Sequence, residues 1–465
     1  MADKDDGRRV YLKPDERAAL GREARAAVRR ADLGEYAPAK DRRDPVAILE
    51  EQGADRQQDL LPIRYGRMSV SPFTFLRGSA AVMAADLAAS PVTGLRVQAI
   101  GDAHLSNFGV FATPERRLVF DVNDFDETLP GPWEWDVKRL VASVVVAAED
   151  NGADRAAATA AARRTAAAYR LSMRRFADDT TLDVWYAHLD FEDWVRTRSR
   201  KSRQAANARF LQKTRARTSA QVVGKLTEVV AGELRFKDQS PLVSPLRDLV
   251  PPDEEAVIRD RLRRGFAGYR QSLAPERRHL LDEFRFVDVA RKVVGVGSVG
   301  TRCLIALFRG RRDDDHLVLQ FKEATASVLE PFAGASRYRQ HGARVVHGQR
   351  LVQVASDVFL GWTALKPEGH HYYWRQLKDM KGSIELGWLD AKAFDRYLEG
   401  CAWCLARAHA RSGDPIAIAA YLGSGTAFDK AMGAFAAAYA DQTKQDWEAL
   451  KAAIADGRLE ALTGV

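Results

Sequence analysis

The chain has few cysteines, no long apolar run and little excess of charge of either sign. Its three cysteines, Cys303, Cys401 and Cys404, are too few for a disulfide framework in 465 residues, which favours a reducing compartment. The longest apolar stretch, Leu140 to Ala148, is far shorter than the ~20 residues of a membrane-spanning helix. The charged first forty residues contain no apolar core of a signal peptide. We therefore expect a cytoplasmic protein with no membrane partner.

The balance of charge is only mildly basic. Lysine and arginine number 71 against 63 aspartate and glutamate residues, which gives a formal net charge of +8. This excess fits the binding of anionic small molecules such as nucleotides, and it is too small to indicate nucleic acid as a partner. The densest basic stretch, residues 196–217, is typical of a solvated helix face, although such a stretch could also contact RNA or an acidic substrate.

The pattern of apolar and polar residues changes along the chain and divides it into blocks. Residues 1–60 are predicted to form a charged helical arm, and residues 61–283 the first part of a helical lobe. A strand-rich block covers residues 284–385, and residues 386–465 are helical again. Within these blocks the pattern predicts helical structure over about 135–176, a proline-rich loop over 234–257, a helix over 254–281 and strands between 284 and 323.

Acidic and amide side chains gather after a predicted strand near residue 100. Asp102 and Asn107 lie on the short loop 101–107, and Asp124 follows a predicted hairpin. Carboxylate and amide oxygens are the ligands that Mg²⁺ prefers, and phosphoryl transfer needs little beyond a metal, a positioned base and neutralised phosphates. Asp102 is therefore predicted to accept the proton of an attacking hydroxyl. The candidate metal ligands are Asn107, Asp124, Asp126 and, as the alternative to Asp124, Asp121 in the preceding strand.

These residues carry a resemblance to known enzymes. The run GDAHLSNFG…NDFDETLPGPWEWDVKRL resembles the G-D-x-H-x-x-N…D-F-(D/E)…G-P-x-x-x-D segment of aminoglycoside phosphotransferases and other small-molecule kinases of the protein-kinase-like fold. The resemblance implies that Asp102 is the catalytic base and His104 the loop histidine. It also implies that Asn107 and Asp124 bind the metal and that Asp136 supports the loop. Those kinases usually have a histidine before the Gly-Asp pair, where this chain has isoleucine.

A second motif, G-x-G-x-x-G, contains Gly295, Gly297, Ser298 and Gly300. The residues after it, TRCLIALF, favour a strand rather than the helix that a dinucleotide-binding fold requires. We therefore predict a glycine-rich hairpin whose backbone N–H groups close over phosphates. Lys322 lies on the third predicted strand, where protein kinases place the lysine that pairs with the α- and β-phosphates.

The acid that would pair with Lys322 is not identified by the sequence. Glu330 is the nearest downstream candidate after Glu323. The helix predicted over about residues 336–356 contains no glutamate, although kinases carry the partner acid on such a helix. The ion pair therefore uses Glu330 or is absent.

The two motifs occur in the reverse of the order found in protein kinases. The helix over residues 397–410 resembles the L-A-x-L-H-A helix that follows the hinge in those enzymes, and here it comes after the strand-rich block. We therefore predict an α+β, bilobal, protein-kinase-like fold that is circularly permuted, with the strand-rich nucleotide lobe between two parts of a helical lobe. From Pro62 to Asp446 the sequence also resembles a large bacterial family known as domain of unknown function 2252.

The sequence thus predicts an ATP- and Mg²⁺-dependent phosphotransferase that acts on a hydroxyl of an unidentified, small-molecule acceptor. Transfer of AMP on the same fold, a nucleotide-binding pseudokinase with a regulatory role, and an RNA-associated protein are the alternatives. Cys401 and Cys404 form a C-x-x-C pattern on a predicted helix. Because no further zinc ligands accompany them, they are predicted to be buried helix cysteines.

Overall fold

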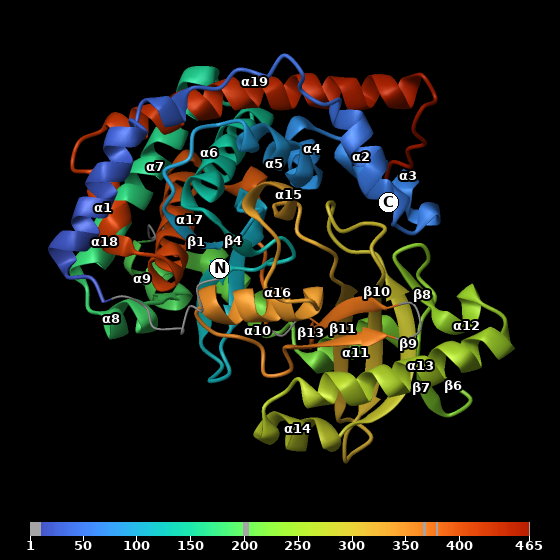
Figure 1. The fold of residues 1–465 in the computed structure, drawn as a ribbon. Coiled ribbons are helices and arrows are strands. Elements are labelled where there is room, and N and C mark those ends of the chain that lie inside the picture. The colour runs from blue at the N-terminus through green and yellow to red at the C-terminus, as the bar shows by residue number, and fades with distance from the viewer. Residues whose placement is uncertain (1–10, 199–203, 366–368, 378–379, 465) are drawn as a thin grey trace, which may run out of the picture.

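The computed structural model describes residues 11–198, 204–365, 369–377 and 380–464. Helices and antiparallel sheets make up an α+β fold, as the sequence predicts. In Figure 1 a helical region lies at the upper left and a six-stranded sheet at the lower right. The chain forms helices first, then builds the sheet, and returns to the helical region for its last three helices. No helix in the described ranges has the length and apolarity needed to cross a membrane.

Five long or central helices form the core of the helical region. The apolar stretch that includes Val141 and Val145 lies in the middle of one of them and is fully buried. The helix predicted over 135–176 is divided in two, because Gly152 adopts a positive φ of 84° that ends the first half. The five helices are α6 (Trp133–Asp150), α7 (Arg155–Asp178), α17 (Ala391–Ser412), α18 (Pro415–Leu422) and α19 (Ala427–Ala455).

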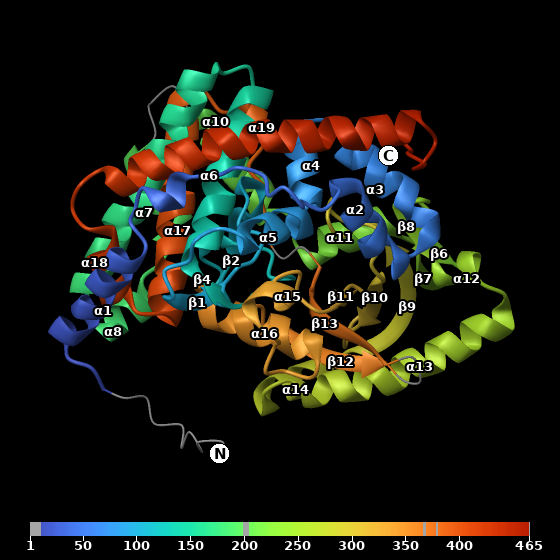
Figure 2. The same cartoon turned by 45° about the horizontal axis from the view of Figure 1, so that its top comes forward.

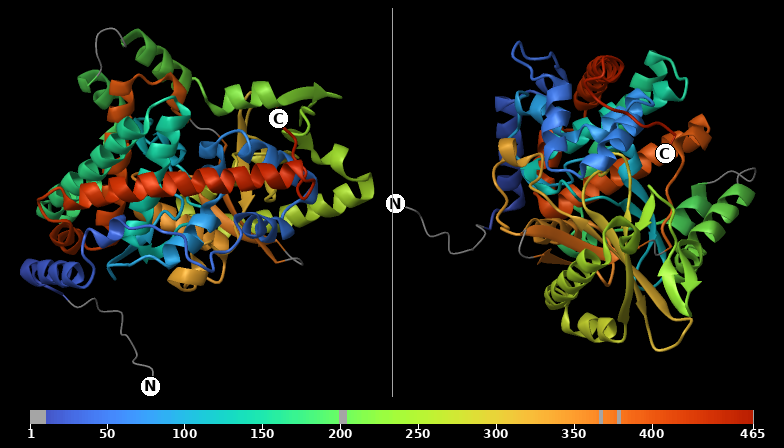
Figure 3. Two further views of the ribbon diagram at one scale, coloured as in Figure 1. Left: turned by 90° about the horizontal axis from the view of Figure 1, so that it is seen from above. Right: turned by 90° about the vertical axis from the view of Figure 1, so that its right-hand side faces the viewer.

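The remaining N-terminal helices surround this core. Helix α19 packs on α6 and α7 and extends to α2, as the views from other sides show (Figures 2 and 3). The first segments are α1 (Pro14–Ala27), α2 (Pro45–Ala54), α3 (Leu61–Met68), α4 (Pro72–Gly78) and α5 (Ala80–Ala88). The first ten residues of the predicted arm lie outside the described residues.

One small sheet packs against α6, and a second packs against α17 and α9 (Phe191–Arg198). Strand β1 (Arg96–Ala99) pairs with β4 (Leu129–Pro132), and β3 (Leu118–Val122) pairs with both β2 (Phe108–Ala112) and β5 (Leu189–Asp190). The predicted hairpin is therefore confirmed. The next helices are α8 (Thr181–Tyr186), α9 and α10 (Gln204–Arg215). The basic stretch 196–217 runs through the last two, and its residues 199–203 lie outside the described residues.

The six-stranded sheet is antiparallel throughout, in the order β12-β13-β11-β10-β9-β8. The strands are β8 (Val243–Pro245), β9 (Arg285–Lys292), β10 (Cys303–Arg309), β11 (His316–Glu323), β12 (Gly361–Leu365) and β13 (His370–Gln376). Helices α15 (Glu330–Ala333) and α16 (His341–Val352) lie between β11 and β12 in the chain. The strands predicted over 284–323 are confirmed, and β8 adds residues from before 284 to the same sheet.

Residues 219–282 contain more regular structure than the sequence predicts. The loop expected over 234–257 instead contributes strands, and the helix expected over 254–281 begins earlier and divides in two because Pro275 starts a new helix. The elements are α11 (Ser219–Leu226), β6 (Thr227–Val230), β7 (Glu233–Phe236), α12 (Leu246–Leu249), α13 (Pro252–Gln271) and α14 (Pro275–Asp282).

The two faces of the large sheet differ in chemistry. Helix α13 covers one face, where Trp374 stacks between Phe321 and Tyr269 with ring centroids 4.2 and 4.6 Å apart. On the opposite face, Ile305, Leu307 and Val318 form an apolar cluster with residues of α11, and polar side chains lie beside this cluster. Gln320 and Lys322 of β11 lie opposite Arg375 and Tyr373 of β13 on that face. The sheet therefore presents a polar and positively charged surface toward the loops of the helical region.

Candidate functional site

The loop over residues 101–107 is held in place by the first turn of α6. Asp136 accepts hydrogen bonds from the backbone N–H groups of Ile100 (2.6 Å) and Gly101 (2.9 Å), and His409 approaches the same carboxylate to 3.1 Å. Gly101 has a φ of +84°, and a Cβ there would lie 2.5 Å from the carbonyl oxygen of Glu127. The loop therefore needs glycine at this position and an acid on α6 to keep its course.

Asp102 projects from this loop into a polar, buried environment. Its carboxylate accepts a hydrogen bond of 2.8 Å from Nε of Arg139, on α6. His104 lies 3.6 Å from the other carboxylate oxygen. Burial raises the pKa of Asp102, and it lowers the pKa of His104 well below its usual range, so this imidazole is neutral. A carboxylate with a raised pKa, fixed by an arginine, is suited to accept a proton in a reaction.

Asn107 and Asp124 approach the same space from the two ends of the hairpin. The side-chain amide of Asn107 donates to the backbone carbonyl of Asp102 at 2.5 Å, which orients its oxygen away from that carbonyl. Burial and the neighbouring Asp126 raise the pKa of Asp124. Two carboxylates two residues apart in a buried loop therefore repel each other, and positive charge placed beside Asp124 would stabilise both.

Lys322 is the cation that neutralises one of these carboxylates. Its Nζ forms an ion pair with Asp126 and lies 2.5 Å from Oγ of Ser298, although only 2% of the lysine side chain is exposed. The hydroxyl of Tyr373 donates to the second oxygen of Asp126 at 2.7 Å. Burial opposes ionisation of Asp126, but the ion pair with Lys322 outweighs it and lowers the pKa of Asp126. Asp126 is therefore an anion fully engaged by the sheet, whereas Asp124 is not.

The glycine-rich turn between β9 and β10 lies against the helical region. Gly295 and Gly300 have φ values of +66° and +87°, which only glycine adopts readily. The guanidinium of Arg56 donates to the carbonyl of Gly297 at 2.8 Å, and a Cβ on Gly297 would lie 3.0 Å from the carbonyl of Arg77. The turn is thus closed over the acidic loops by contacts with α2–α4, instead of standing free above them.

These segments line one cavity of about 120 Å³. Its walls combine residues near 100, near 125 and near 297, so segments almost two hundred residues apart in sequence meet there. The predicted site residues that line it are Asp102, His104, Asn107, Asp124, Asp126, Gly295, Gly297 and Ser298. Lys322 contacts two of these, Asp126 and Ser298, and Gly300 closes the turn behind them.

Two predicted residues lie elsewhere. Asp121 is 1% exposed, and its carboxylate accepts hydrogen bonds from Nη2 of Arg407 (2.6 Å) and from the backbone N–H of Val354 (2.7 Å). Glu330 accepts a hydrogen bond from the backbone N–H of Ser327 and does not contact Lys322. Between Asp121 and Asp124, the structure brings only Asp124 to the cavity.

Three residues that support the site carry no recognisable signal in the sequence. Arg139 fixes Asp102, and Tyr373 fixes Asp126. Arg344, on α16, donates to the backbone carbonyls of Asp126 and Thr128, each at 2.7 Å. Helix α16 therefore holds the acidic loop through hydrogen bonds from Arg344 to two backbone carbonyls of that loop. Each is an ordinary residue of a helix or strand, and only the tertiary contact gives it a role.

Asn107 and Asp124 offer an amide oxygen and a carboxylate, which are the kinds of oxygen donor that a hard divalent cation takes. In the described ranges, no three or more histidine, cysteine, aspartate or glutamate side chains are grouped as a metal-binding cluster. Mg²⁺ nevertheless needs only one or two protein carboxylates when phosphates supply the other ligands. Asn107 and Asp124 both line the cavity, and burial and Asp126 raise the pKa of Asp124 although Lys322, Arg375 and Lys381 act to lower it. The cysteines of the C-x-x-C pattern are buried free thiols, as predicted.

The chain belongs to a bacterial protein family. The family model described as "Uncharacterized protein conserved in bacteria (DUF2252)" matches residues 56–453, which include every residue of the cavity described above except Gln52. No curated protein and no solved structure matches the chain.

Proposed function

We propose that the chain is an ATP- and Mg²⁺-dependent phosphotransferase that acts on a hydroxyl of a small molecule. One observation carries the proposal. Lys322, from the sheet, and Ser298, from the glycine-rich turn, contact Asp126, on the loop that also carries Asp124, across 196 and 172 residues of sequence. A lysine, a glycine-rich turn and a metal-binding acid that meet at one cavity are the parts that phosphoryl transfer requires.

The topology of the large sheet supports a nucleotide-binding role. The glycine-rich turn joins β9 to β10, Lys322 lies on the next strand, and α16 follows before the last two strands. Protein kinases place a glycine-rich loop and the lysine of their third strand in the same succession. In the proposed circularly permuted kinase-like fold, the sheet is the nucleotide lobe and the helices before and after it form the second lobe.

The loop residues then have separate tasks. Asp102 would accept the proton of the acceptor hydroxyl. At the same time the hydroxyl oxygen of the acceptor would bond to the γ-phosphorus, and the bond between that phosphorus and the leaving ADP oxygen would break. Arg139 would hold the carboxylate of Asp102 in position during this transfer. Asn107 and Asp124 would hold Mg²⁺, which when bound neutralises charge on the phosphates.

The described conformation is a closed one. The cavity of about 120 Å³ is small beside the ~300–1,000 Å³ of ordinary ligand pockets. Lys322 is not among the residues that line this cavity, and the Nζ of Lys322 is engaged by Asp126 and Ser298. Binding of a triphosphate therefore requires the glycine-rich turn to move away from Asp126, so that Lys322 exchanges a carboxylate for phosphate oxygens.

The test measures nucleotide binding and turnover separately. A Mg·ATP concentration of ~100 times Kd adds ~2.7 kcal/mol of stability. At ~2.1 cal/mol/K of unfolding entropy per residue, 465 residues give ~1 kcal/mol/K, so Tm should rise by about 3 °C. Lys322→Met should abolish this rise, and Lys451→Met, at an exposed surface lysine, should preserve it. No rise at millimolar Mg·ATP would contradict the proposal.

Turnover is followed by release of ADP. Asp102→Asn should preserve the Tm rise and eliminate ADP release, because it removes the proton acceptor and leaves the phosphate contacts in place. A regulatory pseudokinase is the second candidate, and one observation favours it: α16 contains no acidic residue to pair with Lys322. Nucleotide binding without ADP release in the unmodified protein, across a panel of hydroxyl acceptors, would support that second candidate.

A further inference from the structure

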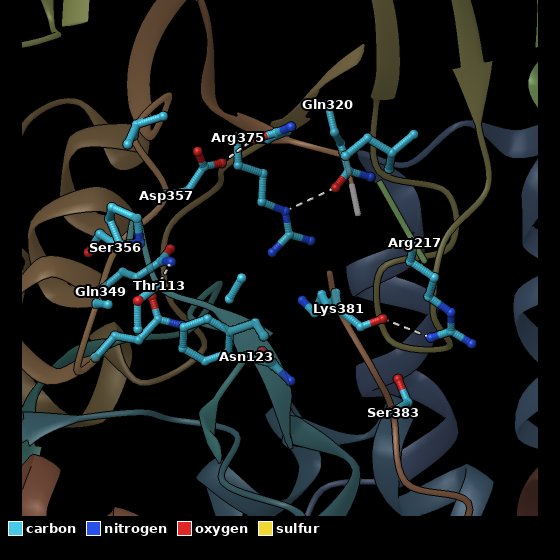
Figure 4. Close-up of a pocket in the computed structure, with 18 of the residues that line it drawn as sticks. Thr113, Asn123, Arg217, Gln320, Gln349, Ser356, Asp357, Arg375, Lys381 and Ser383 are labelled. Carbon is cyan, nitrogen blue, oxygen red and sulfur yellow. Dashed lines mark hydrogen bonds between the residues drawn. The ribbon is translucent and has the colours of Figure 1, made fainter. Parts of the chain in front are cut away.

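A second and larger cavity lies on the same polar face of the large sheet. Its volume is about 520 Å³, and its lining includes Gln320 of β11, Arg375 of β13 and Gln349 of α16 (Figure 4). Gln320 is two residues from Lys322 on the same strand, so this cavity lies next to the smaller one along the sheet. The residues of the site described above do not account for its chemistry.

The lining of this cavity is positively charged. Five of its residues are arginine or lysine, and two, Asp357 and Glu385, are acidic. Asp357 already accepts hydrogen bonds from the backbone N–H groups of Phe359 and Gln376, and Glu385 is exposed at the rim. Pockets for uncharged small molecules are predominantly apolar, with few polar groups. This lining is therefore suited to an anion.

Arg375 is held so that its terminal groups face the cavity. Its Nε donates to Oε1 of Gln320 at 3.0 Å, and its guanidinium lies 5.8 Å from the ring centre of Tyr373. In Figure 4 the end of the side chain projects from the strand toward Lys381. Within the described ranges, no hydrogen bond engages its two Nη groups. A planar guanidinium with two free N–H edges is the group that binds phosphate or carboxylate oxygens in pairs.

Lys381 faces Arg375 from the other side of the cavity (Figure 4). The guanidinium of Arg217 donates to its backbone carbonyl at 2.8 Å, which positions the segment. No carboxylate in the described part of the chain forms an ion pair with its Nζ. Burial and the nearby Arg375 lower the pKa of Lys381 to about 7. Arg375 and Lys381 thus repel each other across the cavity, Asp124 offsets this repulsion only in part, and an anionic ligand would stabilise both basic groups.

We propose that this cavity is a phosphate-binding site, in which Arg375 and Lys381 hold the phosphate oxygens and Gln320 orients the arginine. The proposal depends on the side chains of this cavity and not on chemistry at Asp102. The phosphate has two possible sources. It is either the terminal phosphate of the nucleotide itself, which would place the α-phosphate near Asp102 and favour AMP transfer, or the phosphate of a separate acceptor molecule.

The first experiment uses pyrophosphate without Mg²⁺ as the probe and measures its Kd by calorimetry on the full chain. Arg375→Met and Lys381→Met should each raise Kd by ~10- to 100-fold, as the loss of a charge-assisted hydrogen bond predicts. Lys451→Met, at an exposed lysine that lines neither cavity, is the control and should change Kd less than threefold. Circular dichroism verifies folding, and Arg375→Lys, which keeps the charge, should give an intermediate Kd. No binding of pyrophosphate, or equal affinity in all variants, would overturn the proposal.

The second experiment identifies the source of the phosphate. If the site holds the terminal phosphates of the nucleotide, pyrophosphate competes with a non-hydrolysable ATP analogue, and Arg375→Met weakens the analogue far more than AMP. If it holds a separate molecule, pyrophosphate and the analogue bind together, and Arg375→Met leaves the affinity for the analogue unchanged. Both results support a phosphate site. Failure of the analogue to bind would contradict the proposed function. The binding of pyrophosphate alone decides whether the larger cavity is a phosphate-binding site.

Discussion

The buried ion pair between Asp121 and Arg407 allows a direct test of whether Asp121 has a structural role, in contrast to the cavity carboxylate of Asp124. Arg407 is fully buried, and its Nη2 lies 2.6 Å from the carboxylate of Asp121. Within the described residues, Nε and Nη1 of Arg407 have no hydrogen-bond partner. Asp121→Ala would therefore leave a guanidinium in the core with its charge uncompensated.

The size of this effect follows from the burial of both partners. Removal of one member of a buried ion pair destabilises a protein by ~3–5 kcal/mol, because the remaining charge stays in a poorly solvating environment. With ~2.1 cal/mol/K of unfolding entropy per residue over 465 residues, Tm should fall by about 3–5 °C. The double variant Asp121→Ala/Arg407→Leu should lose less than the sum of the two single variants, since neither charge is then left alone.

The assay is thermal unfolding with and without Mg·ATP, and Asp124→Ala is the control. Asp124 is a cavity carboxylate whose pKa burial raises, so its removal should change Tm by less than ~1 °C and eliminate the rise caused by Mg·ATP. Asp121→Ala should lower Tm and preserve that rise. If Asp121→Ala leaves Tm unchanged and abolishes the response to Mg·ATP, the structural role assigned to Asp121 is wrong.

Three further predictions follow from burial and backbone geometry. The three cysteines are buried and burial raises the pKa of each thiol, so Ellman's reagent should label none at pH 8 in the folded protein and all three in urea; fast labelling of the native protein would refute this. Gly101→Ala should lower Tm more than Gly94→Ala, since both positions have positive φ but only the first places a Cβ against a carbonyl; equal losses would remove the clash as the cause. Burial raises the pKa of Glu134 to about 7, against ~4.5 in the unfolded chain, so the folded state binds more protons. The free energy of unfolding therefore falls as the pH rises from ~4.5 to about 7. The difference in Tm between Glu134→Gln and the unmodified protein should therefore be about 2 °C larger, in favour of the variant, at pH 8 than at pH 5.5. A difference in Tm that does not depend on pH would contradict the raised pKa of Glu134.

Local patterns were sufficient to predict much of the fold around the site. The hairpin over residues 108–122 and the strands after residue 284 follow from alternating apolar residues and intervening turn residues, which act over a few positions. The helical prediction over 135–176 is confirmed, and Gly152, with its positive φ, divides the segment into two helices. The order of strands in the large sheet could not follow from such patterns, since it depends on contacts between distant segments.

The partner of Lys322 shows the same limit at the level of one side chain. The sequence offered Glu330 as the nearest acid, and the structure pairs the lysine with Asp126. These two residues are 196 positions apart, and their pairing depends on how the sheet packs on the helical region. Distance along the chain therefore did not predict which acid pairs with Lys322. The residue types of the two motifs predicted only that a lysine and several acids would be present at the site.

The acids near residue 121 show what distinguishes a structural carboxylate from one available for chemistry. Asp121, Asp124 and Asp126 lie within six residues and look equivalent in the sequence. Asp121 is neutralised by an arginine of the core and Asp126 by Lys322, and only Asp124 lacks an ion-pair partner in the described ranges. A cation that binds here thus gains most at Asp124, and the same argument applies with opposite sign to Arg375 and Lys381 in the neighbouring cavity. Asp124 interacts with Arg375 and Lys381 through space, without an ion pair in the described ranges, so a ligand that brings both a cation and an anion would stabilise all three groups.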